Sequence, residues 1–447
     1  MSCRFAGTPD AASLWRNVMT KRSAIAPLPP ELARAPGDPG LFGRPYPHAA
    51  GCLGSLYSCV PSALSFPRQI NAGENQDLYF AAQLALDALA DAAIRPNPSA
   101  PLNGFVALGY APPFSCATVN WLEHTYFIDQ TMEIIEKFFP SAPAESLDSV
   151  HRRLKESIPA PDAASFLAGT GGRIAAWVAR EACFDGEAHL SDSASLSGMT
   201  VLRQAMDALR TGRVDVALAG ALEPPLSRAL LEGLSGSMKF QTEGRLAPYS
   251  PDSTGTLPGE GGAMFVMKRR ADALKAHDRI YALVKSVASA AIPSPAEGLE
   301  KLFLRAADEA RCEITSIDLA EGHGSGDPGK DAPELEALKS LRPGGGGAAI
   351  GLGSVKGNIG HTLRASAAAS LAKVALALYH RVLPPMADGG ETADGSDPES
   401  GVYLLHEARP WISGDAAVRP RRALLNAFGS GGHAACAILE EEPEVRS

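Results

Sequence analysis

Residues 348–370, AAIGLGSVKGNIGHTLRASAAAS, combine three kinds of local structure in one short stretch. The apolar run AAIGLGSV is typical of a buried strand, and the alanine-rich end predicts a helix of small residues. Between them lies a polar, glycine-rich loop that carries Lys356 and His361. A strand, a loop and a helix in succession form the repeating unit of α/β proteins. We therefore expect an α/β fold in which this lysine and histidine point into one cleft.

The rest of the chain repeats this alternation, with apolar runs that indicate strands buried between helices. No linker-like stretch divides the chain, so we expect one domain over 1–447, with an N-terminal half (1–265), a C-terminal half (266–447) and an insertion or cap at about 111–163. Helices are expected at 78–92, 196–210, 272–278 and 365–379, and strands at 104–110, 213–220, 261–269 and 279–290.

Composition excludes several classes of protein. The 447 residues carry a formal net charge of −9, and 45% are hydrophobic, which argues against disorder. The longest basic run is Lys268–Arg270, too short for a general nucleic-acid surface. The most apolar stretch, Ala365–Tyr379, is interrupted by Lys373 and is too short to span a membrane. Because the start has no signal-peptide pattern, we expect a cytoplasmic protein.

The seven cysteines are scattered and form no CxxC pair, so we expect reduced thiols. His323, Asp331 and Glu334 are ligand types for a metal, yet their spacing matches no catalytic zinc site, and we expect none. No phosphate loop and no dinucleotide-binding fingerprint occurs.

Four glycine-containing segments place reactive side chains where chemistry is possible. In HLSDSASLSGM (189–199), Ser195 lies where a strand ends and a helix begins. This position suits a nucleophile that faces the helix macrodipole, and it equally suits an ordinary N-cap serine.

The second segment, EGHGSGDPGKDAPELEAL (321–338), holds His323, with Asp331 and Glu334 at the start of a helix. Alone, these carboxylates would simply complement the helix dipole. Together with Lys356 and His361 of the third segment, the two histidines form a plausible set for binding an oxyanion and transferring protons. The fourth segment, NAFGSGGHAACAILEEE (426–442), is a glycine turn that either offers backbone N–H groups to an anion or is a plain β-turn.

Read in order, five segments resemble the successive motifs of β-ketoacyl synthases, most closely the ketosynthase domains of polyketide synthases. The segment TVNWLEHTYFIDQT (118–131) resembles iterative ketosynthases of polyunsaturated fatty acid synthases. The resemblance implies a thiolase fold, a duplicated five-layer αβαβα architecture and a homodimer. The motifs are DSASLSG, PYSPDSTGTLPGEGGAMFVMKR, EGHGSGDPGKDAPE, GSVKGNIGHT and NAFGSGGHAACAILEEEP.

The resemblance also implies roles for individual residues. His323 and His361 match the two catalytic histidines, Lys356 matches the lysine, and Asp331 with Glu334 match the acidic pair. The nucleophilic cysteine of the family falls on Ser195. A helix dipole can bring a thiol to the thiolate but cannot ionise a hydroxyl, so Ser195 would need a base such as His361 or His323.

Other implied positions depart from the family pattern. Ser430 replaces a bulky aromatic residue, although its backbone N–H could pair with that of Ser195 as an oxyanion hole. Ser325, Asp327, Phe428 and Gly429 fall along the substrate tunnel and pantetheine arm, with Asp327 in place of a threonine. The resemblance implies no cofactor beyond the phosphopantetheine of an acyl carrier protein, which is the expected partner.

The leading hypothesis is an acyltransferase that acts on carrier-bound acyl or malonyl thioesters in polyketide or fatty-acid-type biosynthesis, with Ser195 as acyl acceptor. One alternative is decarboxylation of a malonyl carrier without a covalent step. Others are a cysteine-to-serine variant of an elongating ketosynthase, or a non-catalytic, chain-length-factor-like protein that heterodimerises with an active ketosynthase. The cluster Lys268, Arg269, Arg270 and Lys275 either docks an acidic carrier or is a solvated helix face.

Overall fold

A computed structural model describes residues 1–35, 38, 40–57, 76–111, 121–158, 160, 172–342, 349–387, 401–413, 419–429 and 431–443. In this part of the chain, a five-stranded sheet has the order β1-β7-β6-β4-β5 and a six-stranded sheet the order β12-β10-β9-β14-β15-β8. The strands of the first sheet are β1 (Ser2–Phe5), β4 (Gly104–Gly109), β5 (Ala188–Ser191), β6 (Val216–Glu223) and β7 (Gly261–Met267). Those of the second are β8 (Leu283–Ala291), β9 (Leu319–Glu321), β10 (Ile350–Gly353), β12 (Val402–Leu404), β14 (Arg422–Phe428) and β15 (His433–Glu440).

Two small sheets pair β2 (Ala26–Pro27) with β3 (Ala49–Ala50) and β11 (Val382–Leu383) with β13 (Arg409–Pro410). The larger helices are α1 (Ala11–Met19), α2 (Gln76–Asp91), α4 (Ile128–Phe138), α5 (Ala144–Ser157), α7 (Gly172–Glu181), α8 (Ser197–Arg210), α9 (Arg228–Ser235), α11 (Pro295–Ala310), α12 (Pro328–Ser340) and α14 (Ser366–His380). Short helices are η1 (Gly54–Leu56), η2 (Glu123–Phe127), α10 (Arg270–Lys275), η3 (Ile314–Ser316), α13 (Lys356–Ile359) and η5 (Leu363–Ala365).

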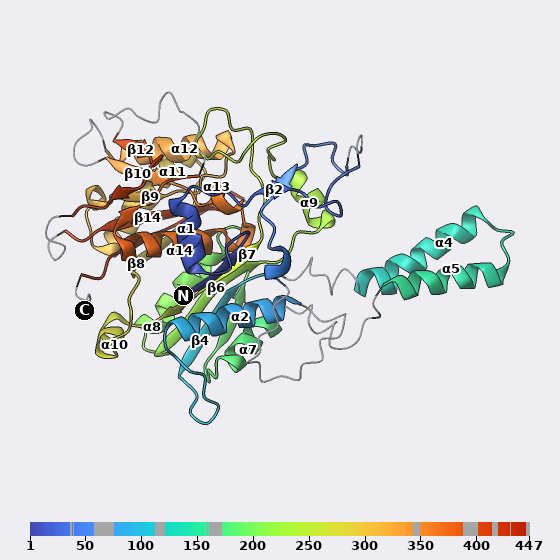
Figure 1. The fold of residues 1–447 in the computed structure, drawn as a ribbon, viewed down its shortest axis with the longest axis horizontal. Coiled ribbons are helices and arrows are strands. Elements are labelled where there is room, and N and C mark those ends of the chain that lie inside the picture. Colours follow the sequence, from blue (N-terminus) through green and yellow to red (C-terminus); the bar gives the residue numbers. More distant parts are fainter. Residues whose placement is uncertain are drawn as a thin grey trace.

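The helices and sheets stack in five layers (Figure 1). Helices α2 and α7 cover the outer face of the first sheet, and α8 and α14 lie between the two sheets. Helices α11 and α12 cover the outer face of the second sheet. The order of layers is therefore α, β, α, β, α, which confirms the predicted architecture. The first sheet is built from residues up to 267 and the second from residues after 282.

Strand β6 lies in the first sheet with helices packed on both of its faces. The sequence predicted a strand over 213–220, whereas β6 begins at Val216 and ends at Glu223, and every residue in it is buried. Val216 and Leu218 pack toward α2 and α7, while Ala217 and Ala219 pack toward α8. Both faces of β6 are therefore covered, which agrees with the expectation that strands lie buried between helices.

Helix α14 confirms the buried helix expected over 365–379. Its residues from Ser366 to Leu378 are all buried between the sheets, including the ammonium-bearing Lys373. Small side chains allow this close approach on both sides. Within the described residues, no helix combines the length and apolarity needed to cross a membrane.

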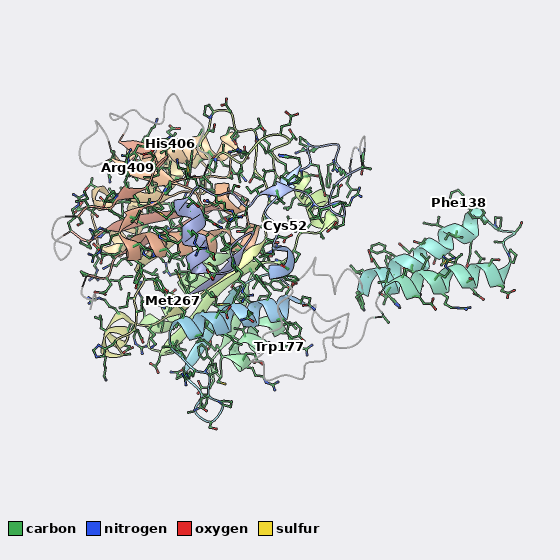
Figure 2. All side chains as sticks on the ribbon, in the orientation of Figure 1. Cys52, Phe138, Trp177, Met267, His406 and Arg409 are labelled. Carbon is green, nitrogen blue, oxygen red and sulfur yellow. The ribbon has the colours of Figure 1, made fainter. Side chains whose placement is uncertain are left out.

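The expected insertion at 111–163 contains a helical hairpin. Helices α4 and α5 pack on each other and project away from the stacked sheets (Figure 1). Ile128 and Met132 are buried in the hairpin, whereas Phe138, at its far end in Figure 2, is 77% exposed. A role for this hairpin as a cap remains a prediction.

Five cysteines lie in the described residues, and all are free: Cys3, Cys52, Cys183, Cys312 and Cys436. Burial raises the pKa of the Cys3 and Cys52 thiols to about 12, which keeps them protonated. This confirms the predicted reduced thiols for these five, while Cys59 and Cys116 lie outside the described residues.

Candidate functional site

The loop that carries His323 is wrapped around two buried carboxylates. It connects β9 to α12 and donates four backbone N–H groups. Those of His323 and Gly324 reach Glu334 at 2.7 and 3.1 Å, and those of Ser325 and Gly326 reach Asp331 at 2.8 and 2.9 Å. The carboxylates therefore fix the shape of the loop, beyond any effect on the helix dipole.

Two residues that the sequence did not single out complete this carboxylate centre. The Tyr249 hydroxyl donates to Glu334 at 2.8 Å and its backbone N–H donates to Asp331 at 3.0 Å, while the Asn426 side chain donates to Glu334 at 2.6 Å. Burial raises the pKa of both carboxyls, and these donors favour the ionised form. Tyr249 and Asn426 both lie in segments that carried the family resemblance, and this was the sequence signal that could have identified them.

Lys356 lies at the start of α13 and is buried against the histidine loop. Its Nζ donates to the backbone carbonyl of His323 at 2.5 Å, and burial lowers the pKa of this lysine to about 8. Beside it, Glu321 and Lys373 form a fully buried ion pair at 2.7 Å. Glu321 also accepts the N–H of Val355 at 2.7 Å, so this pair supports the lysine loop. The sequence had shown Lys373 only as an interruption in an apolar helix.

His361 is held by backbone pairing with the segment 257–259. Its N–H donates to the carbonyl of Leu257 at 2.7 Å, and its carbonyl accepts the N–H of Gly259 at 2.9 Å. Gly360, directly before it, has a φ of +81°, and a Cβ there would lie 2.4 Å from the Pro258 carbonyl oxygen. A glycine is required at this turn for both reasons.

The two histidine rings meet in one place, as the sequence predicted. Their centroids are 5.3 Å apart and their planes are inclined by 73°. Nδ1 of His323 accepts the backbone N–H of Phe428 at 3.2 Å, and Nδ1 of His361 accepts that of Leu363 at 3.0 Å. Burial, followed by the nearby charge of Lys356, holds the pKa of each ring well below its usual value. Both rings are therefore neutral with the proton on Nε2.

This arrangement leaves a hydrogen-bond donor of His323 without a partner in the part of the chain that the structure describes. Nε2 of His323 is buried and has no hydrogen-bond partner among the described residues. A buried donor without a partner is costly for a folded protein and favours binding of an acceptor.

Ser195 lies in a different environment from the histidines. The N-cap of α8 is Leu196, which makes no side-chain cap bond, so Ser195 is not the N-cap serine that one interpretation suggested. Ser197 instead bonds the turn, accepting from the N–H of Ser193 at 2.9 Å and donating to the carbonyl of Ala194 at 2.8 Å. Ser195 is half-buried, and the described residues offer its Oγ no hydrogen bond.

A close contact connects the Ser195 turn to the histidines. The Phe428 ring lies 4.9 Å from the His323 ring, and a Cβ on the adjacent Gly429 would lie 2.8 Å from Cδ1 of Leu196. The end of β14 thus touches both the histidine loop and the residue after Ser195. Ser430 lies outside the described residues, so its pairing with Ser195 as an oxyanion hole remains a prediction.

The residues expected along the pantetheine arm have structural partners. The Ser325 hydroxyl donates to Asp331 at 3.3 Å, and Asp327 caps α12 by accepting the N–H of Gly329 at 3.1 Å. Their contacts with a substrate, and those of Phe428 and Gly429, remain predictions.

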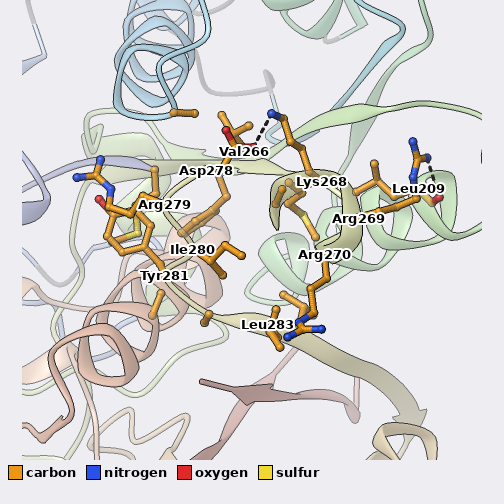
Figure 3. Close-up of a pocket in the computed structure, with 18 of the residues that line it drawn as sticks. Leu209, Val266, Lys268, Arg269, Arg270, Asp278, Arg279, Ile280, Tyr281 and Leu283 are labelled. Atoms are coloured by element: carbon orange, nitrogen blue, oxygen red, sulfur yellow. Dashed lines mark hydrogen bonds and ion pairs between the residues drawn. The ribbon is translucent and has the colours of Figure 1, made fainter. Parts of the chain in front are cut away.

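The basic cluster considered as a docking site for a carrier lies elsewhere. Lys268 pairs with Asp278 at 2.6 Å, Arg269 with Asp272 at 2.6 Å, and Arg270 with Glu442 at 2.6 Å. Nearby lies a cavity of about 660 Å³, shown in Figure 3, with apolar walls from Leu202, Met206 and Phe265. None of the proposed catalytic residues lines this cavity, so it is separate from the histidine site.

Comparisons with known proteins agree with these motifs. Residues 142–273 match the family model described as beta-ketoacyl synthase, N-terminal domain, and residues 281–389 match that of the C-terminal domain. One component of the polyunsaturated fatty acid synthase from Thraustochytrium is 32% identical over 321 residues, which cover 68% of this chain and 11% of that protein. The pikromycin polyketide synthase component PikAII from Streptomyces venezuelae is 32% identical over 287 residues, 62% of this chain and 8% of that protein.

The chain thus spans about a tenth of the length of these relatives. A solved ketosynthase from module 6 of the bacillaene synthase of Bacillus subtilis matches with a TM-score of 0.77. The match has 22% sequence identity and covers 99% of this chain and 71% of that one, which shows the shared fold.

Proposed function

The chain belongs to the β-ketoacyl synthase family, and we propose that it removes carbon dioxide from malonyl-type thioesters carried by an acyl carrier protein. One observation carries this proposal: backbone N–H groups donate to Nδ1 of both His323 and His361, which places the proton of each neutral ring on Nε2. Two such donors, 5.3 Å apart between ring centroids, suit one thioester carbonyl oxygen.

The reaction uses these donors to stabilise an enolate. The bond between the malonyl α-carbon and its carboxylate breaks, and the electron pair moves onto the α-carbon and the thioester oxygen. Carbon dioxide leaves, and a proton from solvent completes an acetyl thioester. Preorganised donors favour this step because their orientation is already fixed by the backbone N–H groups of Phe428 and Leu363. In this proposal the substrate enters on a phosphopantetheine arm, and the enzyme is a homodimer.

The same tautomer argues against covalent loading that relies on these histidines. A serine hydroxyl needs a base to remove its proton, and a ring whose cleft-facing nitrogen already holds a proton cannot serve as that base. Ser195 also has no hydrogen bond from its Oγ to either ring.

Acyl transfer through Ser195 is a second candidate, and the shape of its turn favours it. Ala194 has a φ of +50°, and this tight turn presents the half-buried Ser195 before the 14-residue helix α8. The positive end of a helix dipole can stabilise negative charge that develops on an attacking oxygen.

Mass spectrometry distinguishes the two candidates. The protein is mixed with malonyl carrier protein, or with the malonyl thioester of N-acetylcysteamine, and both the thioester and the intact protein are weighed. The proposal expects an acetyl thioester and no acyl adduct, with turnover retained in Ser195→Ala and lost in His323→Ala and His361→Ala. The exposed His406, labelled in Figure 2, provides the matched control His406→Ala, which should retain turnover.

Two results would overturn the proposal. An acyl adduct mapped to Ser195, with turnover lost in Ser195→Ala, would support acyl transfer. Absence of both adduct and decarboxylation with either substrate would support a non-catalytic partner of an active ketosynthase.

A further inference from the structure

Arg364 lies between the loop that carries His361 and the turn that holds Ser195. It lies in η5, three residues after His361, and its side chain is 15% exposed. Its Nη1 donates to both carboxylate oxygens of Glu223 at 3.1 Å, and its backbone N–H donates to the same carboxylate at 3.2 Å. Glu223 ends strand β6 and its side chain is only 2% exposed, so Arg364 is anchored to the buried sheet.

The other edge of the same guanidinium faces the Ser195 turn. Nε of Arg364 lies 3.4 Å from Oδ1 of Asp192, which is an ion pair and not a hydrogen bond, because this buried Nε has no hydrogen-bond partner among the described residues. That oxygen also accepts the backbone N–H of Ala194 at 3.0 Å. One side chain therefore connects the end of β6 to the turn that ends at Ser195.

Both turns joined by Arg364 contain a non-glycine residue with positive φ. Ala194 has a φ of +50° and Leu363 a φ of +39°. Such conformations cost roughly 1 kcal/mol or more and persist where surrounding contacts hold them. The N–H of Leu363 is the donor that fixes the tautomer of His361, and Arg364 is its direct chain neighbour.

We propose that Arg364 is a positioning residue, held by Glu223, that fixes the His361–Leu363 contact and the Ser195 turn relative to each other. Its guanidinium suits this task because its donors point in fixed directions, and the shorter, neutral side chain of glutamine cannot reach both carboxylates. His323 provides an internal comparison, because its tautomer is set by Phe428.

The test reads the tautomers directly. Long-range proton–nitrogen spectra of the histidine rings are recorded for the protein and for Arg364→Gln. We expect His361 to become a mixture of tautomers while His323 keeps its proton on Nε2. We also expect kcat to fall by roughly tenfold or more, with KM little changed. This kinetic measurement rests on the proposed decarboxylation. The spectra test the positioning role of Arg364 even if the protein shows no turnover.

Arg381→Gln is the matched control. Arg381 follows α14 and its Nε lies 3.2 Å from the buried Glu441, so the change also removes an arginine from a buried carboxylate, away from the histidine cleft. This variant should leave both the spectra and kcat unchanged. A folded Arg364→Gln with an unchanged His361 spectrum and unchanged kcat would overturn the inference.

A second variant, Asp192→Asn, tests the inference if Arg364→Gln does not fold. The Asp192 side chain is 44% exposed, and asparagine in its place can still accept the N–H of Ala194. Asp192→Asn removes only the charge that faces Arg364. We expect faster amide hydrogen exchange at 193–195 in this variant, whereas unchanged exchange would overturn the link to the Ser195 turn.

Discussion

The two sides of the candidate site, which we call the histidine wall and the Ser195 turn, are built in different ways. The histidine wall consists of buried loops whose backbone N–H groups are bonded to Glu334, Asp331 and the ring nitrogens. The Ser195 turn is partly exposed and held by short-range bonds of Ser197 and by the Arg364–Asp192 contact. The orientation of the two histidine rings is thus set by the core, whereas the position of Ser195 depends on a few local contacts.

This difference predicts where substitutions will be costly. Changes beneath the histidine wall should affect the stability of the whole chain, because they leave buried charges without partners. Changes near Ser195 should cost less, and changes on the projecting hairpin least of all.

Lys373→Met should have the largest effect. It leaves Glu321 buried without its cation, and breaking a buried ion pair in this way costs about 3–5 kcal/mol. Urea denaturation should show this loss in free energy of unfolding. The double variant Glu321→Gln/Lys373→Met should recover most of it, because glutamine still accepts the N–H of Val355. A loss in free energy of unfolding below about 1 kcal/mol in the single variant would show that the loops around the histidines do not depend on the Glu321–Lys373 pair.

Glu223→Gln should change the pH dependence of stability. Burial raises the pKa of this carboxyl to about 7, against the opposing charge of Arg364, and Asp192 adds to the rise. A raised pKa in the folded state contributes stability that is present below the unfolded value of 4.5 and is lost as pH rises to about 7.

Relative to Glu223→Gln, the unmodified protein should therefore lose about 1.4 kcal/mol per pH unit across this window. Urea denaturation of both proteins at several pH values measures the difference. A constant difference from pH 4.5 to 7 would mean that Arg364 fully offsets the burial of Glu223.

Gly429→Ala tests the contact between the two walls. The new Cβ would lie 2.8 Å from Cδ1 of Leu196, so the side chain or the turn must shift, at a cost of about 1–2 kcal/mol. In a double-mutant cycle with Leu196→Ala, the combined loss should be smaller than the sum of the single losses by about 1 kcal/mol. Additive losses would show that the walls do not touch at this point.

Phe138→Ser should have the smallest effect on stability. The Phe138 side chain is 77% exposed on the hairpin, and exposed substitutions usually change stability by less than about 0.5 kcal/mol. Thermal denaturation checks this expectation. A larger loss would indicate that the hairpin packs against something in solution, and a repeat of the measurement at several protein concentrations would show whether that is a second copy.

The resemblance to β-ketoacyl synthases implied the five layers. The meeting of the two histidines followed from the sequence itself, because motif residues beside glycine lie on loops at strand ends. The sequence did not predict the partners that arrive from distant segments. Tyr249 and Asn426 reach Glu334 across 85 and 92 residues, and Lys373 reaches Glu321 across 52. Such contacts depend on how the strands are ordered in the sheets, which local periodicity does not encode.

The sequence also did not show which of three nearby serines stabilises the turn before α8. Ser193, Ser195 and Ser197 are spaced so that each suited the turn before α8, and only the backbone path shows that Ser197 makes the turn-stabilising bonds. The bounds of β6 were also misplaced, since the strand predicted over 213–220 runs over Val216–Glu223.

The backbone donors to the two Nδ1 atoms have a consequence for how this cleft can evolve. Neither donor comes from the turn that holds Ser195, so residue 195 can change its chemistry without disturbing the protonation of either ring. In the proposed reaction, an exchange at position 195 can therefore change the chemistry while the backbone donors to both Nδ1 atoms stay in place.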